Sequence, residues 1–437
     1  MSTPDVAPVP APSHEGVVFR WQRGVPVHDV PLLTRTSLAL LFFVLVGTGL
    51  GVLRLFGGAL GPFSAMTDQY AWGVWKTFNT MALTALGSGA MGVGIAAWVF
   101  GYKHFHAVMR TALLTSLLFY GTGILGIVTD VGRPWNAWNA VLPWHWNTQS
   151  PLWEVLIAMP TYCFVFLLYE NGPTVVERLW WKGSPGVRRW IDRWHPRIRR
   201  TYPYVVAAAY IVPMMHQSSL GALMLLSGNK VHPLWQSEML PLLYLVQAWI
   251  CGFAAVIAIL MASCLVWRRP LDMKVLADLA RVMSSLTLFW LTARVADLAG
   301  RGVLSRGFSG DRYSVMFLVE TLAILVPAIV LRTERFRQVP RVVFTMAVLT
   351  AIGGLLYRFT PTTLAFMPAE HATYFPAVPE VLVMFGLVAL VILLYSVAVK
   401  RFAILPAPLE TWYRMFGAAP AGSFADGRPA DGHARHD

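Results

Sequence analysis

The sequence of 437 residues is strongly apolar and basic: 56% of its residues are hydrophobic, 13% are charged, and the formal net charge is +13. Water-soluble domains average about a quarter charged residues, so this composition excludes a chain of two or three soluble domains. The basic residues lie between apolar runs without any helix-turn-helix, zinc-finger or ribonucleoprotein pattern, which excludes nucleic-acid binding. The three cysteines also fall inside apolar runs without C-x-x-C spacing, so no iron–sulfur or zinc site is encoded.

Ten apolar runs are each long enough to cross a hydrocarbon core as a tilted helix of about 20 residues. In chain order they cover residues 37–60, 72–101, 107–129, 152–170, 204–226, 240–267, 282–299, 313–331, 342–357 and 381–399. We therefore predict an all-α fold, with one transmembrane bundle of about ten helices over residues 31–405. Residues 1–30 are polar and Pro-rich, without the apolar core of a secretory signal, and residues 406–437 have the composition of a partly disordered tail.

Lysine and arginine are unevenly distributed between alternate connecting segments. If both termini are cytoplasmic, the inner segments carry 26 of the 35 basic residues and the outer segments carry 8, with Arg294 left inside a span. This asymmetry follows the positive-inside rule, so we predict that both termini face the cytoplasm. The basic stretch 178–200 then becomes a cytoplasmic surface exposed to solvent or to lipid headgroups.

The outer connection 131–151 is unusually rich in aromatic side chains. It contains Trp135, Trp138, Trp144, Trp146 and His145. An aromatic belt at the membrane surface explains some of these tryptophans. A surface-lying segment over a ligand pocket explains all of them, and this is the interpretation that we favour.

Polar and ionisable residues collect in the outer half of the predicted bundle. Because each ionisable side chain inside a span costs about 2.5–3.5 kcal/mol on insertion scales, such residues mark sites or pathways unless they form structural pairs. They are Lys76, Asn79, Asp130, Arg133, Glu154, Arg294, Asp297 and Glu320. The i, i+3 spacing predicts two ion pairs, Asp130 with Arg133 and Arg294 with Asp297. Structural neutralisation is the alternative, and the first pair favours function because it borders the Trp-rich connection.

A second group of polar residues lies deeper. Tyr120, Tyr162 and His216 fall near the middle of their predicted helices, and Arg110 marks the cytoplasmic end of the third helix. A string of Arg110, Tyr120, His216 and Glu154 could relay protons between the two membrane surfaces. Hydrogen-bonded packing between helices is the alternative.

The histidines argue against a haem. A b-type haem held by two imidazoles needs two buried histidines on facing helices, whereas His216 is the only histidine deep in a predicted span. Without a dinucleotide or Walker motif either, we predict that the chain uses a diffusible quinone and holds no haem, iron–sulfur cluster or other metal.

Three motifs carry a family resemblance. They are D-V-G-R-P-W-N from Asp130, H-W-N-T-Q-S-P-L-W-E-V from His145, and M-H-Q-S-S-L-G-A-L-M from Met215. The first two resemble the signature of the NrfD/PsrC family of integral membrane subunits, and the third is similar to the branch that contains HybB, the membrane subunit of periplasm-facing nickel–iron hydrogenases. The resemblance covers about residues 31–404.

The resemblance implies a haem-free, ten-helix subunit in the bacterial cytoplasmic membrane. It would exchange electrons between menaquinone or ubiquinone and an iron–sulfur subunit on the outer face, itself bound to a catalytic subunit, with a nickel–iron hydrogenase favoured. It also implies that the quinone lies near Asp130 and Arg133 and that Glu154 and His216 are protonatable. Arg110 and Tyr120 lie outside the motifs.

From these observations we predict a quinone-reactive subunit that is not catalytic alone. Its pocket would lie between the second, third, fourth and eighth spans, with proton uptake and possible proton translocation. The predicted quinone-binding residues are Asn79, Asp130, Arg133, Trp135, Asn136, His145, Asn147 and Glu154. The predicted proton-transfer residues are Arg110, Tyr120, Glu154, His216 and Glu320.

Three alternatives stay open. A subunit of the same family could serve a sulfur-compound, formate or multihaem cytochrome module. A secondary transporter would suit the intramembrane charges and the glycine-rich run 86–94. A plain structural anchor for a soluble enzyme would need no buried string of polar residues.

Overall fold

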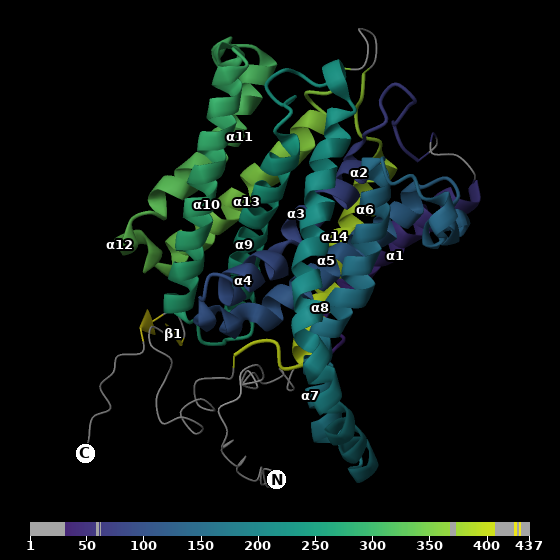
Figure 1. Cartoon of the computed structure of the whole chain (residues 1–437), viewed down its shortest axis with the longest axis vertical. Helices are drawn as coiled ribbons and strands as arrows, with labels where there is room; N and C mark the ends of the chain where they lie inside the picture. The colour runs from purple at the N-terminus through teal and green to yellow at the C-terminus, as the bar shows by residue number, and fades with distance from the viewer. Residues whose placement is uncertain are drawn as a thin grey trace.

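The computed structural model describes residues 31–57, 61, 63–367 and 373–406, together with two short strands near the C-terminus. It is a bundle of long helices that run along one common direction (Figure 1). In this described part, nine helical segments are long and apolar enough to cross a membrane. The predicted all-α membrane fold is therefore confirmed. The predicted segment 1–30 and most of 406–437 lie outside the described residues.

The first half of the chain forms four membrane-spanning segments and the beginning of a fifth long helix. The elements are α1 (Arg35–Gly57), α2 (Val74–Thr77), the π-helix η1 (Phe78–Ala82), α3 (Leu83–Leu86), α4 (Gly89–Trp98), η2 (Lys103–Val108), α5 (Met109–Asp130), η3 (Pro134–Val141), η4 (Pro143–His145), α6 (Pro151–Pro160), the π-helix η5 (Thr161–Leu167), α7 (Leu168–Lys182) and α8 (Pro185–Leu225).

The second half contributes five further helices of membrane-spanning length, together with the short helix α12 and three 3-10 turns. The elements are η6 (Gly228–Lys230), α9 (Leu240–Val266), α10 (Met273–Gly300), η7 (Leu304–Phe308), α11 (Arg312–Val330), α12 (Glu334–Arg337), α13 (Pro340–Phe359), η8 (Thr360–Thr362), α14 (Val378–Arg401), β1 (Phe424–Ala425) and β2 (Arg428–Pro429). The two strands pair in antiparallel fashion.

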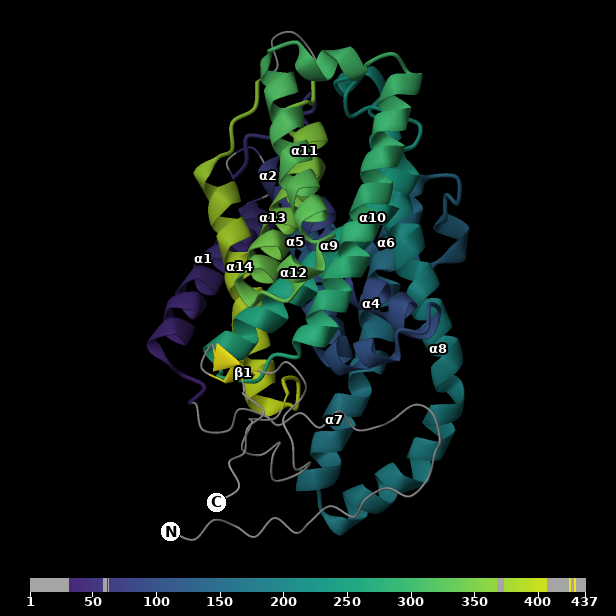
Figure 2. The same cartoon turned by 90° about the vertical axis from the view of Figure 1, so that its left-hand side faces the viewer.

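The fifth predicted span, residues 204–226, forms the second half of α8. This helix has 41 residues and is therefore about 60 Å long at 1.5 Å per residue. It runs along the whole bundle and projects beyond it together with the end of α7 (Figures 1 and 2). The polar run from His216 to Ser219 makes it less apolar than the nine segments counted above, because a site interrupts its hydrophobic surface.

The second span is interrupted along its length. It starts as α2, widens into η1, continues as α3, and restarts as α4 after a turn at Gly87 and Ser88. The fourth span widens in the same way at η5, directly after Pro160, which cannot donate a helix hydrogen bond. Single π-helical turns of this kind are frequent at functional sites, because they re-aim side chains.

Helix α9 is the centre of the bundle, and it packs against α3, α4, α8, α10 and α13. Helix α1 lies at the periphery and packs mainly on α14. There, a Cβ atom added to Gly47 would lie 2.9 Å from the Cα atom of Gly386, so the two backbones touch. The two ends of the bundle are named the Arg110 end and the Asp130 end, after residues at the start and the end of α5.

Candidate functional site

Asp130 is the last residue of α5 and is buried at the end of the bundle. Arg54 from α1 donates to its backbone oxygen at 2.7 Å and to that of Val131 at 2.6 Å. The positive charges of Lys76 and Arg54 both act on the Asp130 carboxyl group. Lys76 also lies over the ring of Trp72, 5.5 Å from its centroid. Two segments distant in sequence, α1 and α2, therefore place positive charge beside Asp130, while the charge of Glu380 opposes their effect.

The predicted ion pair between Asp130 and Arg133 does not form. The helix ends at Asp130, and Val131 adopts an extended conformation, so Arg133 leaves the helical face that the i, i+3 spacing presumes. Arg133 is exposed, and the ion pairs of the described residues do not include it.

The Trp-rich connection folds into the short helices η3 and η4 and stays on the surface of the isolated chain. Its predicted site residues Trp135, Asn136, His145 and Asn147 are all exposed, Trp135 to 61%. One contact ties the connection to α6, where Trp146 packs against Trp153 with ring centroids 5.2 Å apart. These side chains therefore form an exposed aromatic surface beside Asp130, and they do not close over it.

Asn79 lies in the π-helix η1 and faces α5 one turn before Asp130. A Cβ atom on Gly126 would lie 2.3 Å from the Asn79 amide, so only glycine fits at that position. Asn79 is fully buried, yet neither its amide nitrogen nor its amide oxygen has a hydrogen-bond partner among the described residues. Because an unsatisfied buried amide is costly, this amide can bind a water molecule or a ligand.

The deeper polar residues meet along one face of α8. Gln217 donates to the hydroxyl of Tyr120 at 3.0 Å, and Ser219 donates to the carboxylate of Glu154. His216 lies beside Tyr120, with ring centroids 5.6 Å apart. Three residues predicted for proton transfer thus meet at one turn of α8. His216 belongs to this turn, and Tyr120 from α5 and Glu154 from α6 contact it.

His216 and Tyr162 are both fully buried with unpartnered polar atoms. Both ring nitrogens of His216 and the hydroxyl of Tyr162 have no hydrogen-bond partner in the described part of the chain. Tyr162 points from η5 toward Tyr120, with ring centroids 4.8 Å apart. The centre of the bundle therefore holds donors and acceptors that protein groups alone leave unsatisfied.

Arg358 was missed by the sequence analysis, because it follows the last apolar residue of a run and was counted in an outer connection. In the structure it lies in α13 and is fully buried. It donates to the side chains of Gln247 at 2.6 Å and Gln217 at 3.2 Å, and to the backbone oxygen of Tyr244 at 2.6 Å. No carboxylate of the described residues forms an ion pair with it, so its charge is solvated by neutral dipoles alone.

The predicted pair of Arg294 and Asp297 is wrong, because each residue has another partner. Arg294 from α10 forms a fully buried ion pair with Glu320 of α11, at 2.5 Å. Asp297 pairs instead with Arg301, one turn further along α10, at 2.7 Å, and accepts a hydrogen bond from Ser237 at 2.8 Å. Trp235 donates to the second oxygen of Glu320 at 3.0 Å, so this carboxylate is held at both oxygens.

Arg110 does not extend the string of polar residues toward Tyr120. It forms an ion pair with Glu177 of α7 at 2.7 Å and donates to the backbone oxygen of Ala403 at 2.8 Å. An arginine stays protonated in proteins, so it cannot accept and release a proton. Arg110 therefore closes one end of the bundle as a structural cation.

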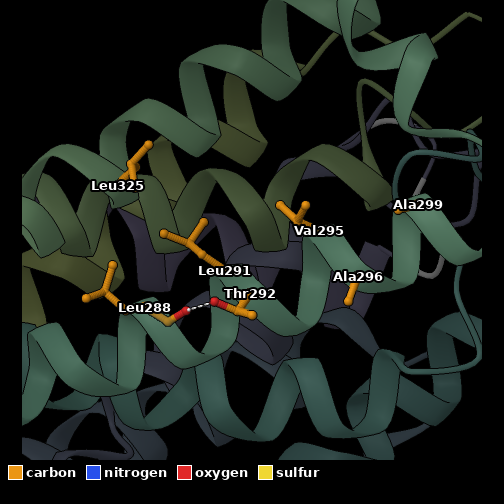
Figure 3. Close-up of a pocket in the computed structure, with 7 residues that line it drawn as sticks. All are labelled: Leu288, Leu291, Thr292, Val295, Ala296, Ala299 and Leu325. Carbon is orange, nitrogen blue, oxygen red and sulfur yellow. Dashed lines mark hydrogen bonds between the residues drawn. The ribbon is translucent and has the colours of Figure 1, made fainter.

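An open apolar groove lies on the outside of α10 and does not belong to this site. It is lined by Leu288, Leu291, Thr292, Val295, Ala296, Ala299 and Leu325 (Figure 3). The Thr292 hydroxyl donates to the backbone oxygen of Leu288 at 2.9 Å, so its hydrogen is already engaged. A quinone headgroup needs free donors at its carbonyls, and this groove offers none.

Comparison with known proteins identifies the class. The model of the family described as "Polysulphide reductase, NrfD" matches residues 63–367, and the chain belongs to this family of integral membrane subunits. It is a multi-pass protein of the inner membrane.

Two relatives extend over most of the chain. One is the "Probable Ni/Fe-hydrogenase 2 b-type cytochrome subunit" of Escherichia coli, 38% identical over 82% of this chain and 89% of the relative. Another is the "Menaquinone reductase, integral membrane subunit" of Nitratidesulfovibrio vulgaris, 26% identical over 84% of this chain and 91% of the relative. The predicted resemblance to the NrfD family and to its hydrogenase branch is confirmed, and it implies quinone-linked electron transfer.

Proposed function

We propose that this chain passes electrons between an iron–sulfur partner, docked at the Asp130 end, and a membrane quinone. The observation that carries the proposal is the buried Asn79 amide without a partner, one helical turn from the buried Asp130. A quinone headgroup needs hydrogen-bond donors at its carbonyls within an otherwise apolar slot, and an amide with a free N–H group meets that need. The printed name of the N. vulgaris relative, a menaquinone reductase subunit, points to the same substrate class.

Each residue of this end then has a chemical role. Asn79 donates to one quinone oxygen, and Asp130 supplies a proton to the reduced oxygen. Lys76 and Arg54 stabilise the Asp130 carboxylate after it has given up that proton. Glu154, bonded to Ser219, replenishes protons from the His216 face of α8.

The exposed Trp-rich connection supports a partner at the same end. Trp138 and Trp144 are 60% and 76% exposed, on a segment that flanks Asp130. Exposed aromatic clusters of this kind are enriched at protein interfaces. We propose that a periplasmic, ferredoxin-like iron–sulfur subunit covers Trp135, Trp138 and Trp144 and brings its cluster close to the quinone. A catalytic subunit, with a nickel–iron hydrogenase favoured by the name of the E. coli relative, would supply the electrons.

The basic residues near the Arg110 end favour a cytoplasmic position for that end. Protons taken up there and delivered to quinone would cross part of the membrane field, so turnover would build or consume a membrane potential. We therefore propose that quinone reduction by this chain is coupled to proton translocation.

The name of the E. coli relative includes a b-type cytochrome, but the described residues do not fit a haem. Two axial imidazoles on facing helices would be needed, and His216 is the single histidine buried in the middle of the described bundle. Its ring neighbour is Tyr120, whereas His104 pairs with Asp278 and His232 stacks on Tyr313 near the two ends. We therefore propose a haem-free subunit.

The glycine-rich run that suggested a transporter has another explanation. A Cβ atom on Gly94 would lie 2.5 Å from the Tyr210 ring, and one on Gly87 would lie 2.7 Å from the Tyr120 ring. The glycines thus make room for two buried phenols, and no feature of the described chain favours substrate passage over quinone chemistry.

The test uses the membrane complex purified through this chain, with reduced methyl viologen as electron donor and decylubiquinone as acceptor. Asn79→Leu and Asp130→Asn should lower quinone reduction at least about tenfold, a modest share of what a positioned acid–base group contributes. Electron uptake by the iron–sulfur partner should stay unchanged, because reduced methyl viologen delivers its electrons to the partner and does not contact Asn79 or Asp130. Wild-type rates in both variants would refute the site, and isolation of the chain without any iron–sulfur protein would refute the function.

A further inference from the structure

Glu170 is a buried carboxylic acid that is not among the predicted site residues. It lies in α7, one turn after the π-helix η5, and is only 7% exposed. No hydrogen bond or ion pair joins its carboxyl group to another residue of the described chain. An acid without a partner inside a membrane helix is costly to keep, so such residues mark proton or ion pathways.

A polar face of α7 leads from the Arg110 end to Glu170. Thr174 and Glu177 follow Glu170 at i+4 and i+7, so all three lie on one side of the helix. Thr174 is 8% exposed. Glu177 is held by the ion pair with Arg110, in which the two side chains are 13% and 11% exposed. The face therefore connects the ion pair at the Arg110 end with the Glu170 acid.

On the other side of Glu170, two tyrosines lie deeper in the bundle. Helices α7 and α8 pack against each other in opposite directions, and Tyr169 stacks on Tyr202 with ring centroids 6.0 Å apart. About two turns deeper on each helix are Tyr162 and Tyr210. The charge of Glu170 acts on both of these phenols, and the Tyr162 hydroxyl has no partner in the described residues.

These phenols continue to the polar centre. The Tyr210 ring lies against Gly94, and the Tyr120 ring lies against Gly87, two helical turns along the same segment. Tyr120 in turn contacts Tyr162 and accepts a hydrogen bond from Gln217. We name Tyr162, Tyr210 and Tyr120 the phenol column. Within it, Tyr120 contacts both Tyr162 and His216, and the charge of Glu170 acts on Tyr162 and Tyr210.

We propose that Glu170 is the carboxyl group that takes up protons from the Arg110 end and passes them to the phenol column. The proposal rests on the proposed function, because quinone reduction consumes two protons. The Glu170 carboxylate accepts a proton from water at the Arg110 end. The neutral acid then donates it through water to the Tyr162 oxygen, about two turns deeper, as that hydroxyl releases its own proton toward Tyr120 and His216. No electron is transferred, and Glu170 returns to its ionised form.

The test compares Glu170→Gln, Glu170→Asp and Glu170→Ala in the purified complex, again with reduced methyl viologen and decylubiquinone. Gln keeps the size of the side chain, removes the titrating group and breaks no bond, so assembly should be preserved. We expect its quinone reduction to fall at least about tenfold, with a larger solvent deuterium isotope effect, because proton supply becomes limiting. Asp should retain part of the rate, and azide, a small weak acid, should restore part of the rate to the Ala variant. Glu334→Gln, which removes an exposed carboxyl group of α12, is the matched control.

The outcomes separate the two proposals. A wild-type complex that does not reduce decylubiquinone overturns the proposed function and the role of Glu170 with it. A working wild type with an equally fast Glu170→Gln variant overturns the role of Glu170 alone. The proposal is also overturned if the Gln variant is slow, azide does not restore the rate of the Ala variant, and the Asp variant retains none of the rate. Glu170 would then have a structural role. If the Gln variant does not assemble, the Asp variant decides. A wild-type rate and isotope effect in Glu170→Asp, whose carboxyl group is withdrawn by one methylene, would contradict a transfer that depends on the position of this carboxyl group.

Discussion

The guanidinium group of Arg358 lies over the ring of Tyr244, 4.0 Å from the ring centroid, in the fully buried centre of the bundle. Its charge is balanced by the π-face and by three oxygen acceptors, from Gln217, Gln247 and the Tyr244 backbone. A cation held in this way repels other cations, including protons that move as hydronium. Arg358 therefore separates the phenol column from the ion pair of Arg294 and Glu320.

The acceptors around Arg358 make a specific prediction. Arg358→Met should lower the melting temperature of the complex in detergent, because each buried acceptor left unpaired costs about 1–3 kcal/mol. Adding Gln247→Leu should recover part of the loss, since it removes one orphaned acceptor. Thermal unfolding followed by size-exclusion chromatography measures both variants. Equal melting temperatures of the single variant and the wild type would contradict the network.

The two arginine–carboxylate pairs of α10 should differ sharply in their contribution to stability. Glu320→Gln leaves the Arg294 charge buried without a counter-ion, which typically costs about 3–5 kcal/mol. Asp297→Asn breaks a pair whose Arg301 side chain is 29% exposed, and exposed pairs contribute about 0–1 kcal/mol. Guanidinium-induced or thermal unfolding of both variants should rank them in this order. A larger effect of Asp297→Asn would revive the pairing that sequence spacing suggested.

The contact of Gly94 with Tyr210 can be tested by adding one methyl group. Gly94→Ala places a Cβ atom 2.5 Å from the Tyr210 ring and should destabilise the protein by about 1–3 kcal/mol through overpacking. Gly49→Ala is the control, because no atom of the described residues lies within 4 Å of its Cβ position. There the substitution should be neutral or stabilising, since alanine is favoured over glycine in helices by about 1 kcal/mol. The two melting temperatures should move in opposite directions or by clearly different amounts.

His232 predicts a pH dependence of stability. It lies in the connection between α8 and α9, where burial lowers the pKa of its imidazole, with Arg306 acting in the same sense and Asp311 in the opposite one. Its Nδ1 accepts a hydrogen bond from the backbone N–H of Leu234 at 3.4 Å, which requires the neutral ring. Because the folded pKa lies below the unfolded value of about 6.5, stability is complete above that pH and decreases as the pH falls toward the folded pKa.

The measurement is the melting temperature of the complex between pH 7.5 and pH 5. In the wild type it should decrease on acidification, and His232→Gln should flatten this decrease. His145→Gln is the control, measured in the isolated chain, where His145 is exposed in the Trp-rich connection. Identical slopes for the wild type and His232→Gln would show that another group controls the acid sensitivity.

Hydropathy predicted the bundle well because a bilayer selects apolar runs of fixed length. It underestimated the helices that continue past the membrane. Helix α10 starts at Met273, nine residues before the predicted span, because Asp272 caps its first turn and Lys274, Asp278 and Arg281 lie outside the apolar run. Helix α7 likewise continues to Lys182 on an amphipathic, charged surface.

The burial of the candidate site residues was predicted only where local sequence settles it. Asn79 and His216 lie within long apolar segments and Asp130 ends one, and all three are buried. Pairing could not be predicted, since Arg294 meets a carboxylate 26 residues away on another helix. Arg358 and Glu170 were missed for a related reason, because both fall at the edge of an apolar run, where sequence alone cannot tell a buried turn from an exposed one.

The glycine contact between α1 and α14 bears on how the protein is made. Among the membrane helices of the described residues, α1 leaves the ribosome before the others and α14 after them, yet Gly47 and Gly386 bring their backbones into contact. During synthesis the first helix must therefore wait in lipid, without its main neighbour, until almost the whole polypeptide has been inserted. In chains released before α14 is made, α1 would lack its main packing partner. Its unpaired glycine face would then be open to recognition by membrane quality control.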